Sequence, residues 1–353
     1  MKRICIMTGA RPNFMKVAPL IRAIKQNDGA SYELVYAGRA DDTTLEPSLF
    51  DDLGMPRPDV FLGADAPSLN ELTGQVMLRF DQHLNSHPAD VVIVVDDLAS
   101  TMAAAIVTKK RGLRLAHLVA GTRSFDITMP KEVNRLVIDG LSDYLFTAGH
   151  GGSSIATREG AERERVFMVG NILIDNLRYL RNRMTRPDIA DTLGLTEGRY
   201  IVLTVNRRAL MTDEQKLLRL ATTLHDTASR HDIKVVAPLR SRAAQLLADV
   251  ALVVPPLPFL QFGWLTAHAL GVVTDSGNVA EEATFNGVPC ITLNSYTEHI
   301  ETVRVGTNML VGESAELLRQ AAEQMCCRQW KQGSLPEQWD GHTAERIVRT
   351  LLA

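Results

Sequence analysis

The chain has 353 residues, 45% of them apolar, and a formal net charge of −3. This length exceeds the usual size of one domain, and the apolar content is enough for two buried cores, so two domains are expected. The slightly negative charge argues against a nucleic-acid-binding surface. The apolar runs are short, so no membrane-spanning segment is expected.

The cysteines and the first residues indicate the compartment. The four cysteines are Cys5, Cys290, Cys326 and Cys327. Two of them lie in expected buried strands and the other two are adjacent, which fits neither a metal site nor a disulfide framework. The apolar run at 4–7 is too short for a signal peptide, because residues 9–12 end it. A reduced, cytoplasmic protein without metal or other cofactor is expected.

Apolar strand-like runs alternate with helical patterns along the chain, which is typical of parallel sheets covered by helices on both faces. In the first part, strands are expected at 4–7, 34–36, 91–95, 113–118, 144–146 and 166–169. Helices are expected at 12–24, with Pro12 near the first position, and at 71–84, 102–109, 133–141 and 170–183.

The second part repeats this alternation after a polar link at 185–199 that contains Pro187. Strands are expected at 200–204, 234–237, 252–254, 271–274, 290–293 and 309–311. Helices are expected at 213–229, 259–269 and 343–352. The sequence therefore predicts two doubly wound, Rossmann-like α/β domains at 1–180 and 181–335. The last helix, within 336–353, is expected to pack back on one of them.

The stretch 272–282 is the strongest candidate for a ligand site. A buried strand ends there, and Ser276, Gly277 and Asn278 open a helix whose first backbone N–H groups are unpaired. Such a helix start can bind phosphate, and Gly277 allows close approach. Glu282 follows about one turn later, within reach of two ribose hydroxyls. The alternative is an ordinary turn in which Asp275 or Ser276 caps the helix.

In doubly wound domains, ligands bind at the carboxyl ends of the strands. Two further loops of this kind lie in the first domain, at 8–12 and 95–100. A cleft between two such domains would present ligand-binding loops on both of its walls.

Several ordered segments match the non-hydrolysing UDP-N-acetylglucosamine 2-epimerases, which the chain resembles over nearly its full length. They are 8–12 with Lys16, Asp97 with 100–101, 117–124, 129–135, 169–171 with Asp175, 274–282, 287–290 and 306–308. The resemblance implies a glycosyltransferase-B architecture that binds a UDP-sugar between the domains. It also implies a homodimer and a reaction without metal.

The resemblance carries over most of the nucleotide-binding residues. Ser276, Gly277 and Asn278 would bind the phosphates and Glu282 the ribose. Arg11 would supply a forked cation to the pyrophosphate, and Phe262 would lie near the uracil, unless it is simply a core residue. Further sugar or phosphate contacts would come from Lys16, Arg39, Arg123, Arg135, Asn206, Arg240 and His299.

The residues that move protons in the family are mostly replaced. The family reaction removes the proton at C2, expels UDP and adds it back to the inverted sugar, which needs proton carriers beside the sugar. Val119 and Lys131 stand where the family has glutamates, and Asn206 where it has a histidine. A positioned general acid or base contributes roughly 10²–10⁴ in rate. The family reaction by its usual route should therefore be nearly silent.

Three readings stay open. The first is an epimerase in which Asp97, Glu132 and Lys131 take over proton transfer, with Asp96 as a further carrier unless it is a solvated turn carboxylate. The second is changed chemistry, transfer or hydrolysis, in which Arg39, Lys131 and Arg240 attract an acidic sugar or acceptor unless they are surface cations. The third is a catalytically silent protein that binds a UDP-sugar.

Overall fold

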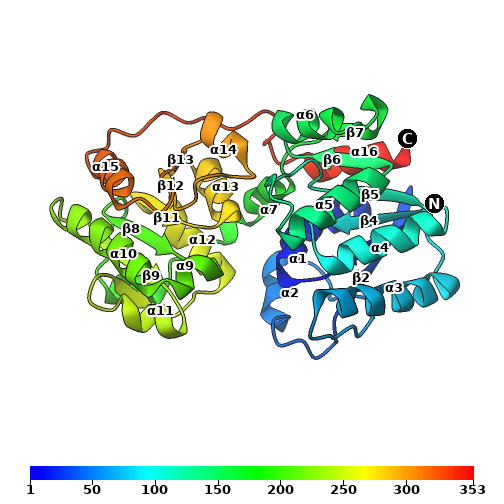
Figure 1. Ribbon diagram of the computed structural model, residues 1–353, viewed down its shortest axis with the longest axis horizontal. Coiled ribbons are helices and arrows are strands. Elements are labelled where there is room, and N and C mark those ends of the chain that lie inside the picture. The colour runs from blue at the N-terminus through cyan, green and yellow to red at the C-terminus, as the bar shows by residue number, and fades with distance from the viewer. The chain divides into compact units, whose positions relative to one another are not determined.

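The computed structural model describes residues 1–353, apart from the side chain of Ser241. The contacts within the chain divide it into two compact units (Figure 1). The first unit consists of Met1–Tyr179 together with Glu337–Ala353, and the second of Leu180–Pro336. Within the described part of the chain, no helix has both the length and the apolar character needed to cross a bilayer.

The first unit is a parallel sheet in the order β3-β2-β1-β4-β5-β6-β7. Its strands are β1 (Lys2–Thr8), β2 (Ala30–Tyr36), β3 (Val60–Phe61), β4 (Val91–Val95), β5 (Arg114–Leu118), β6 (Tyr144–Thr147) and β7 (Val166–Met168). Its helices are α1 (Arg11–Lys25), α2 (Pro47–Leu53), α3 (Leu69–Ser86), α4 (Ala99–Lys110), α5 (Pro130–Leu141), α6 (His150–Arg158), α7 (Ile172–Leu180) and α16 (Thr343–Leu352).

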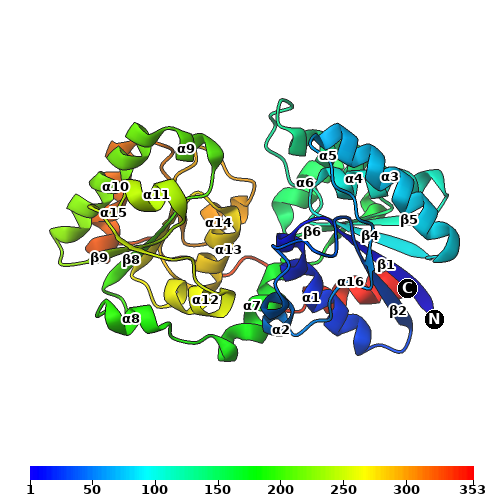
Figure 2. The same cartoon turned by 90° about the horizontal axis from the view of Figure 1, so that it is seen from below.

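Helices cover both faces of this first sheet. On one face, α3, α4 and α5 lie side by side (Figure 2), and a core of small and β-branched side chains such as Val92, Ala104 and Ile138 fills the space beneath them. On the other face, α16 packs against α1 (Figure 2). Asp175 fixes α16 because its carboxylate accepts the backbone N–H groups of Thr343 and Ala344 at 3.1 and 2.7 Å.

The second unit is a parallel sheet in the order β10-β9-β8-β11-β12-β13. Its strands are β8 (Tyr200–Thr204), β9 (Lys234–Pro238), β10 (Leu252–Val254), β11 (Gly271–Thr274), β12 (Cys290–Thr292) and β13 (Asn308–Leu310). Its helices are α8 (Asp188–Thr192), α9 (Arg208–Thr212), α10 (Glu214–Ser229), α11 (Ser241–Leu246), α12 (Phe259–Ala267), α13 (Gly277–Asn286), α14 (Ile300–Arg304) and α15 (Ala315–Cys326).

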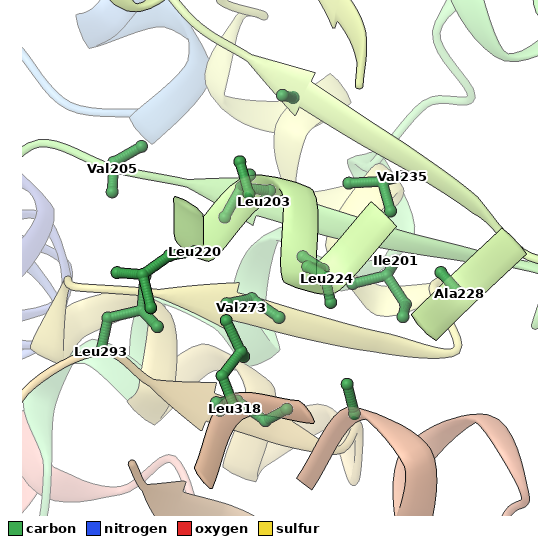
Figure 3. Close-up of a cluster of buried hydrophobic side chains, with 14 of the residues drawn as sticks. Ile201, Leu203, Val205, Leu220, Leu224, Ala228, Val235, Val273, Leu293 and Leu318 are labelled. Carbon is green, nitrogen blue, oxygen red and sulfur yellow. The ribbon is translucent and has the colours of Figure 1, made fainter. Parts of the chain in front are cut away.

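The core of the second unit lies on both faces of its sheet. Figure 3 shows one of the two clusters, where side chains of β8 such as Ile201 and Leu203 meet Leu224 of α10 and Leu318 of α15. The other cluster joins the opposite face to α12 and α13 and includes Tyr200, Trp264 and Val272. The prediction of doubly wound α/β folding is confirmed in both units.

The expected polar link at 185–199 is partly wrong. This segment contains the short helix α8, and its side chains Ala190 and Leu195 are buried in the second core. Polar residues around them hid this contribution in the sequence. Helix α15 was also missing from the expected elements, although Leu318, Ala321, Ala322 and Met325 bury one face of it.

Candidate functional site

In each sheet, the chain adds strands outward in one direction and then in the other, starting from two neighbouring strands. In the first sheet this point lies between β1 and β4, and in the second between β8 and β11. Ligands of doubly wound folds bind at the carboxyl ends of the strands at such points. The candidate site residues of each unit lie on these loops or on the helices that follow them.

In the second unit, helix α13 begins directly after β11. Ser276 is the residue before its first turn, and its own backbone N–H donates to Oγ1 of Thr274 at 3.0 Å. Among the described side chains, none caps this helix start, so the expected alternative of a cap from Asp275 or Ser276 is wrong. The first-turn N–H groups of α13, with the positive end of the helix dipole, suit an anion.

Asp275 connects the two strands at the winding point instead of capping the helix. Its buried carboxylate accepts the backbone N–H of Asn206 at 2.9 Å and that of Arg207 at 2.7 Å. These bonds hold the loop after β8 beside the start of α13. Asn206 is thereby placed next to the candidate phosphate site, with its side chain exposed.

Glu282 is a buried carboxyl group on the second turn of α13. Its Oε2 atom has no hydrogen-bond partner among the described atoms. Burial, with a smaller contribution from Glu281, raises the pKa of Glu282 to about 8. A buried polar atom without a partner is costly to a folded protein, and functional sites are one of the few places where it persists.

His299 lies directly against the start of α13. Its Nδ1 lies 2.7 Å from the carboxylate of Glu281, and a Cβ at Gly277 would come within 2.3 Å of its ring. The absence of a side chain at Gly277 is therefore needed for this close approach. His299 would present its imidazole to an anion bound at the helix start.

The other two candidate residues of the second unit are Phe262 and Arg240. Phe262 on α12 is partly buried and packs against the core around Trp264, which supports the core alternative for it. Arg240 is exposed and precedes α11.

In the first unit, the loops after β1 and β4 contact each other closely. The side chain of Asn13 accepts the N–H groups of Gly9 and Ala10 at 2.9 and 3.2 Å, and it donates to Asp96 at 2.8 Å. Lys16 pairs with the same carboxylate at 2.5 Å. The alternative that Asp96 is a solvated turn carboxylate is wrong, because its side chain is only 16% exposed. Arg11 is exposed at the start of α1.

Asp97 is buried beside two cations of α5. Arg135 contacts its Oδ2 at 2.6 Å, and Nζ of Lys131 lies 3.5 Å from its Oδ1. Burial favours the neutral carboxyl, but Arg135 and Lys131 more than offset it, so the pKa of Asp97 lies below its ordinary value. At neutral pH Asp97 is therefore a carboxylate and a weak base.

Glu132 is occupied by four hydrogen bonds. It accepts from the backbone and side chain of Ser124 and from the backbone of Phe125, each at 2.9 Å, and from Arg135 at 3.0 Å. Burial raises the pKa of Glu132, but these hydrogen-bond donors lower it by more, so the pKa lies below its ordinary value. Its role in this arrangement is to hold the loop after β5, because each carboxylate oxygen already has a donor.

A third buried carboxylate, Asp139 on α5, was not expected from the sequence. It contacts Nδ1 of His117 at 2.6 Å and the guanidinium of Arg123 at 2.7 Å. Arg123 also pairs with Glu159 at 2.5 Å, so its charge is balanced inside the unit. A sequence signal existed, since Asp139 lies four residues after Arg135 and seven after Glu132, on the same helix face.

Asp139→Asn should destabilise the protein by about 2 kcal/mol, because it removes the negative charge between two buried partners. Burial opposes ionisation, yet His117 and Arg123 keep the pKa of Asp139 below its ordinary value. Urea unfolding at neutral pH measures the loss. Asp143→Asn is the matched control. Its partner Lys109 is 30% exposed, so this substitution should lower the free energy of unfolding by less than about 1 kcal/mol. Equal losses in both variants would contradict the assignment.

Three residues of these loops have backbone angles in the left-handed region. They are Asp96, Val119 and Phe125, with φ of 60, 74 and 61°. Such angles are rare for any residue with a side chain and rarest for a β-branched one such as Val119. Strained positions persist mainly at functional sites. The backbone strain therefore favours a functional site at the loops after β4 and β5, although the side chain of Val119 cannot transfer a proton.

A cavity of about 440 Å³ lies beside these loops in the first unit. Gly9, Tyr36 and Ser100 contribute to its lining, and so does Arg39. Arg39 is exposed and pairs with Asp41 at 2.6 Å and more loosely with Asp65 at 3.8 Å. Its charge is thus largely balanced by neighbours on the surface.

Comparison with known proteins gives consistent matches over the whole chain. The sequence profile of a family described as UDP-N-acetylglucosamine 2-epimerase matches residues 22–352. A UDP-N-acetylglucosamine 2-epimerase from Methanocaldococcus jannaschii is 30% identical over 366 residues, covering 99% of this chain and 98% of that protein. A UDP-2,3-diacetamido-2,3-dideoxy-D-glucuronate 2-epimerase from Pseudomonas aeruginosa is 30% identical over 327 residues, covering 91% of each.

A solved structure agrees with these relatives. The crystal structure of the M. jannaschii UDP-GlcNAc 2-epimerase in complex with UDP-GlcNAc and UDP matches with a TM-score of 0.83 and 31% identity, covering 99% of both chains. The fold is accordingly glycosyltransferase-B-like. On the family profile and the full-length relatives together, the chain belongs to the non-hydrolysing UDP-N-acetylglucosamine 2-epimerase family.

Proposed function

We propose that this protein binds a UDP-sugar and that Asp97 is its remaining base for C2 chemistry. The members of its family are isomerases that act on UDP-sugars. The observation that supports the proposal is the uncapped start of α13 in the second unit, together with the partnerless Oε2 of Glu282. In the first unit, Val119 and Lys131 stand where the resemblance implies glutamates.

The nucleotide end is supported by the start of α13 and by Glu282. The start of α13 lacks a cap among the described side chains, so its N–H groups are available to the phosphates through Ser276, Gly277 and Asn278. The partnerless Oε2 of Glu282 would accept a ribose hydroxyl. Binding would thus remove the cost of an unsatisfied buried group.

On this proposal, removal of the C2 proton by residues of the first unit is slow. Removal of the C2 proton needs a base, and the low pKa of Asp97 weakens it in that role. Lys131, 58% exposed and 3.5 Å from Asp97, is the nearest group that could return a proton. Glu132 contributes by holding the loop at 124–125 and not by proton transfer.

Exchange in deuterated water tests this proposal. Purified protein is incubated with UDP-GlcNAc, and in parallel with a UDP-diacetamido sugar, while deuterium at C2 and free UDP are followed by mass spectrometry and NMR. We expect slow deuterium incorporation that Asp97→Asn abolishes, with UDP affinity by calorimetry unchanged. Incorporation that persists in Asp97→Asn would remove this residue from the mechanism.

Binding is tested separately from chemistry. Ser276→Val and Glu282→Ala should each weaken UDP binding at least tenfold, since each removes or blocks a group assigned to the nucleotide. Arg199→Gln is the control, because Arg199 is exposed and directly precedes β8, at the end of the sheet opposite to the start of α13. Unchanged UDP affinity in both variants would show that the nucleotide does not bind at the start of α13.

A silent UDP-sugar-binding protein is the second candidate function. It is favoured by the same replacement of glutamates by Val119 and Lys131, since valine cannot carry a proton. Firm UDP binding without any C2 deuterium would support this candidate over slow epimerisation. UDP release without deuterium would instead indicate transfer or hydrolysis.

A further inference from the structure

A second cluster of reactive side chains lies in the first unit, away from the loops described above. Cys5 of β1 and Glu33 of β2 are direct partners in the parallel register of the two strands, so their side chains lie on the same face of the sheet. His83, near the end of α3, packs onto that face. One ligand atom from each of the three residues lies within 4.8 Å of the others.

His87 lies next to this cluster and contacts Glu33. It follows His83 by four residues, and the two imidazole rings stack with centroids 4.4 Å apart. Its Nδ1 lies 3.0 Å from the hydroxyl of Ser86, while its Nε2 lies 3.8 Å from the carboxylate of Glu33. The Nε2 atoms of both histidines are thus directed to the same carboxylate, since that of His83 lies 2.8 Å from it.

A cavity of about 260 Å³ connects this cluster with the surface. Cys5, Glu33 and His87 line it, together with Ser31 and Ala89. The lining lies where β1, β2 and β4 begin, so the cavity opens at the end of the sheet opposite to Asp97. An ion from solvent could reach the cluster without passing the candidate active site.

We propose that Cys5, Glu33 and His83 form a site for a zinc-type divalent metal ion, with a solvent molecule as the fourth ligand. Thiolate, imidazole and carboxylate are the ligands that zinc prefers, at bonds of roughly 2.0–2.3 Å in a tetrahedron. The ligand atoms of such a tetrahedron lie roughly 3.4 Å apart. The ligand atoms of Cys5, Glu33 and His83, which lie within 4.8 Å of one another, would draw closer to reach this spacing, and a solvent molecule would complete the tetrahedron.

The charges of the three ligands suit this ion. A thiolate and a carboxylate together balance a divalent cation, and the neutral imidazole and a solvent molecule complete the set, so the buried site would carry no net charge. A cysteine thiol is ordinarily protonated at neutral pH, so metal binding would release its proton to solvent, one per ion.

The sequence did not reveal this site because its ligands come from β1, β2 and the end of α3. A second cluster, made of His231, Glu323 and Cys327, is a useful contrast. There the guanidinium of Arg230 lies 3.4 Å from Glu323, and Cys327 is exposed. A neighbouring cation disfavours metal binding at that place.

Metal titration of the full-length protein tests the site. Zinc is added to metal-free, reduced protein in a calorimeter, in two buffers of different ionisation enthalpy, and cobalt is added in parallel to record the thiolate-to-metal absorption band. We expect one ion per chain, release of about one proton per ion, and a rise of the melting temperature with zinc.

Variants assign the binding to the cluster. Glu33→Gln, at a partly exposed position, should fold normally and weaken zinc binding at least tenfold, and Cys5→Ser should abolish the cobalt–thiolate band. Cys327→Ser, in the contrasting cluster, should change neither. Absence of stoichiometric binding, or loss of the band in Cys327→Ser and not in Cys5→Ser, would overturn the proposal.

Discussion

Val119→Glu combined with Lys131→Glu is expected to raise the rate of C2 deuterium exchange in UDP-GlcNAc by roughly 10²–10⁴. Two effects act in the same direction. The new carboxylates supply proton carriers at the positions where the family has glutamates. Loss of the Lys131 cation, 3.5 Å from Asp97, also raises the pKa of Asp97 and makes it a better base.

The matched control for this gain is Val119→Gln with Lys131→Gln. It removes the same cation and introduces side chains of the same size, but neither glutamine can carry a proton. Exchange is measured by mass spectrometry at saturating sugar, so that binding does not contribute. If the two double variants exchange at the same rate, carboxylates at 119 and 131 are not what limits this protein.

Glu282→Gln is expected to make the protein more stable than the wild type at pH 9, by about 4 kcal/mol. Burial raises the pKa of this carboxyl from 4.5 to about 8 in the folded protein. Between these values the folded state holds a proton that the unfolded state has lost. The contribution is therefore complete below pH 4.5 and is lost as the pH rises through about 8.

Urea unfolding of both proteins between pH 5 and 9 measures this effect, and the difference in stability should grow as the pH rises from 5 and level off above about 8. Glu197→Gln, at an exposed position of the same unit, should follow the wild type. Saturating UDP should reduce the divergence, because a ribose hydroxyl would stabilise the Glu282 carboxylate. Parallel curves for wild type and Glu282→Gln would contradict the assigned burial effect.

The regular elements could be predicted where one residue type dominates. The β-branched runs at 91–95 and 200–204 became central strands β4 and β8. Helix α15 was missed although Ser314 caps it and Leu318, Ala321 and Met325 repeat at helical spacing, so the signal was present. Helix α8 could not be found this way, because five residues hold too few positions for a period to show.

The position of the candidate site could be predicted from the sequence, but the ion pairs within it could not. The turn after β11 and the loops after β1 and β4 lie where strand order predicts them. The partners of each carboxylate could not be read from the chain, because Lys16 is 80 residues from Asp96 and Arg135 is 38 from Asp97. For the same reason the ion pair between Asp96 and Lys16 could not be predicted from the sequence.

Arg135 shares its single guanidinium between Asp97 and Glu132, and this arrangement has an evolutionary consequence. The two carboxylates exceed this guanidinium by one negative charge, and Lys131, with its side chain 58% exposed, adds a second cation beside Asp97. Position 119 takes no part in these bonds, so a substitution there can change the chemistry of the site while the bonds among Asp97, Glu132 and Arg135 are kept. The residues that would decide the reaction and the bonds that hold this part of the fold are therefore largely separate, and the first can change while the second stay the same.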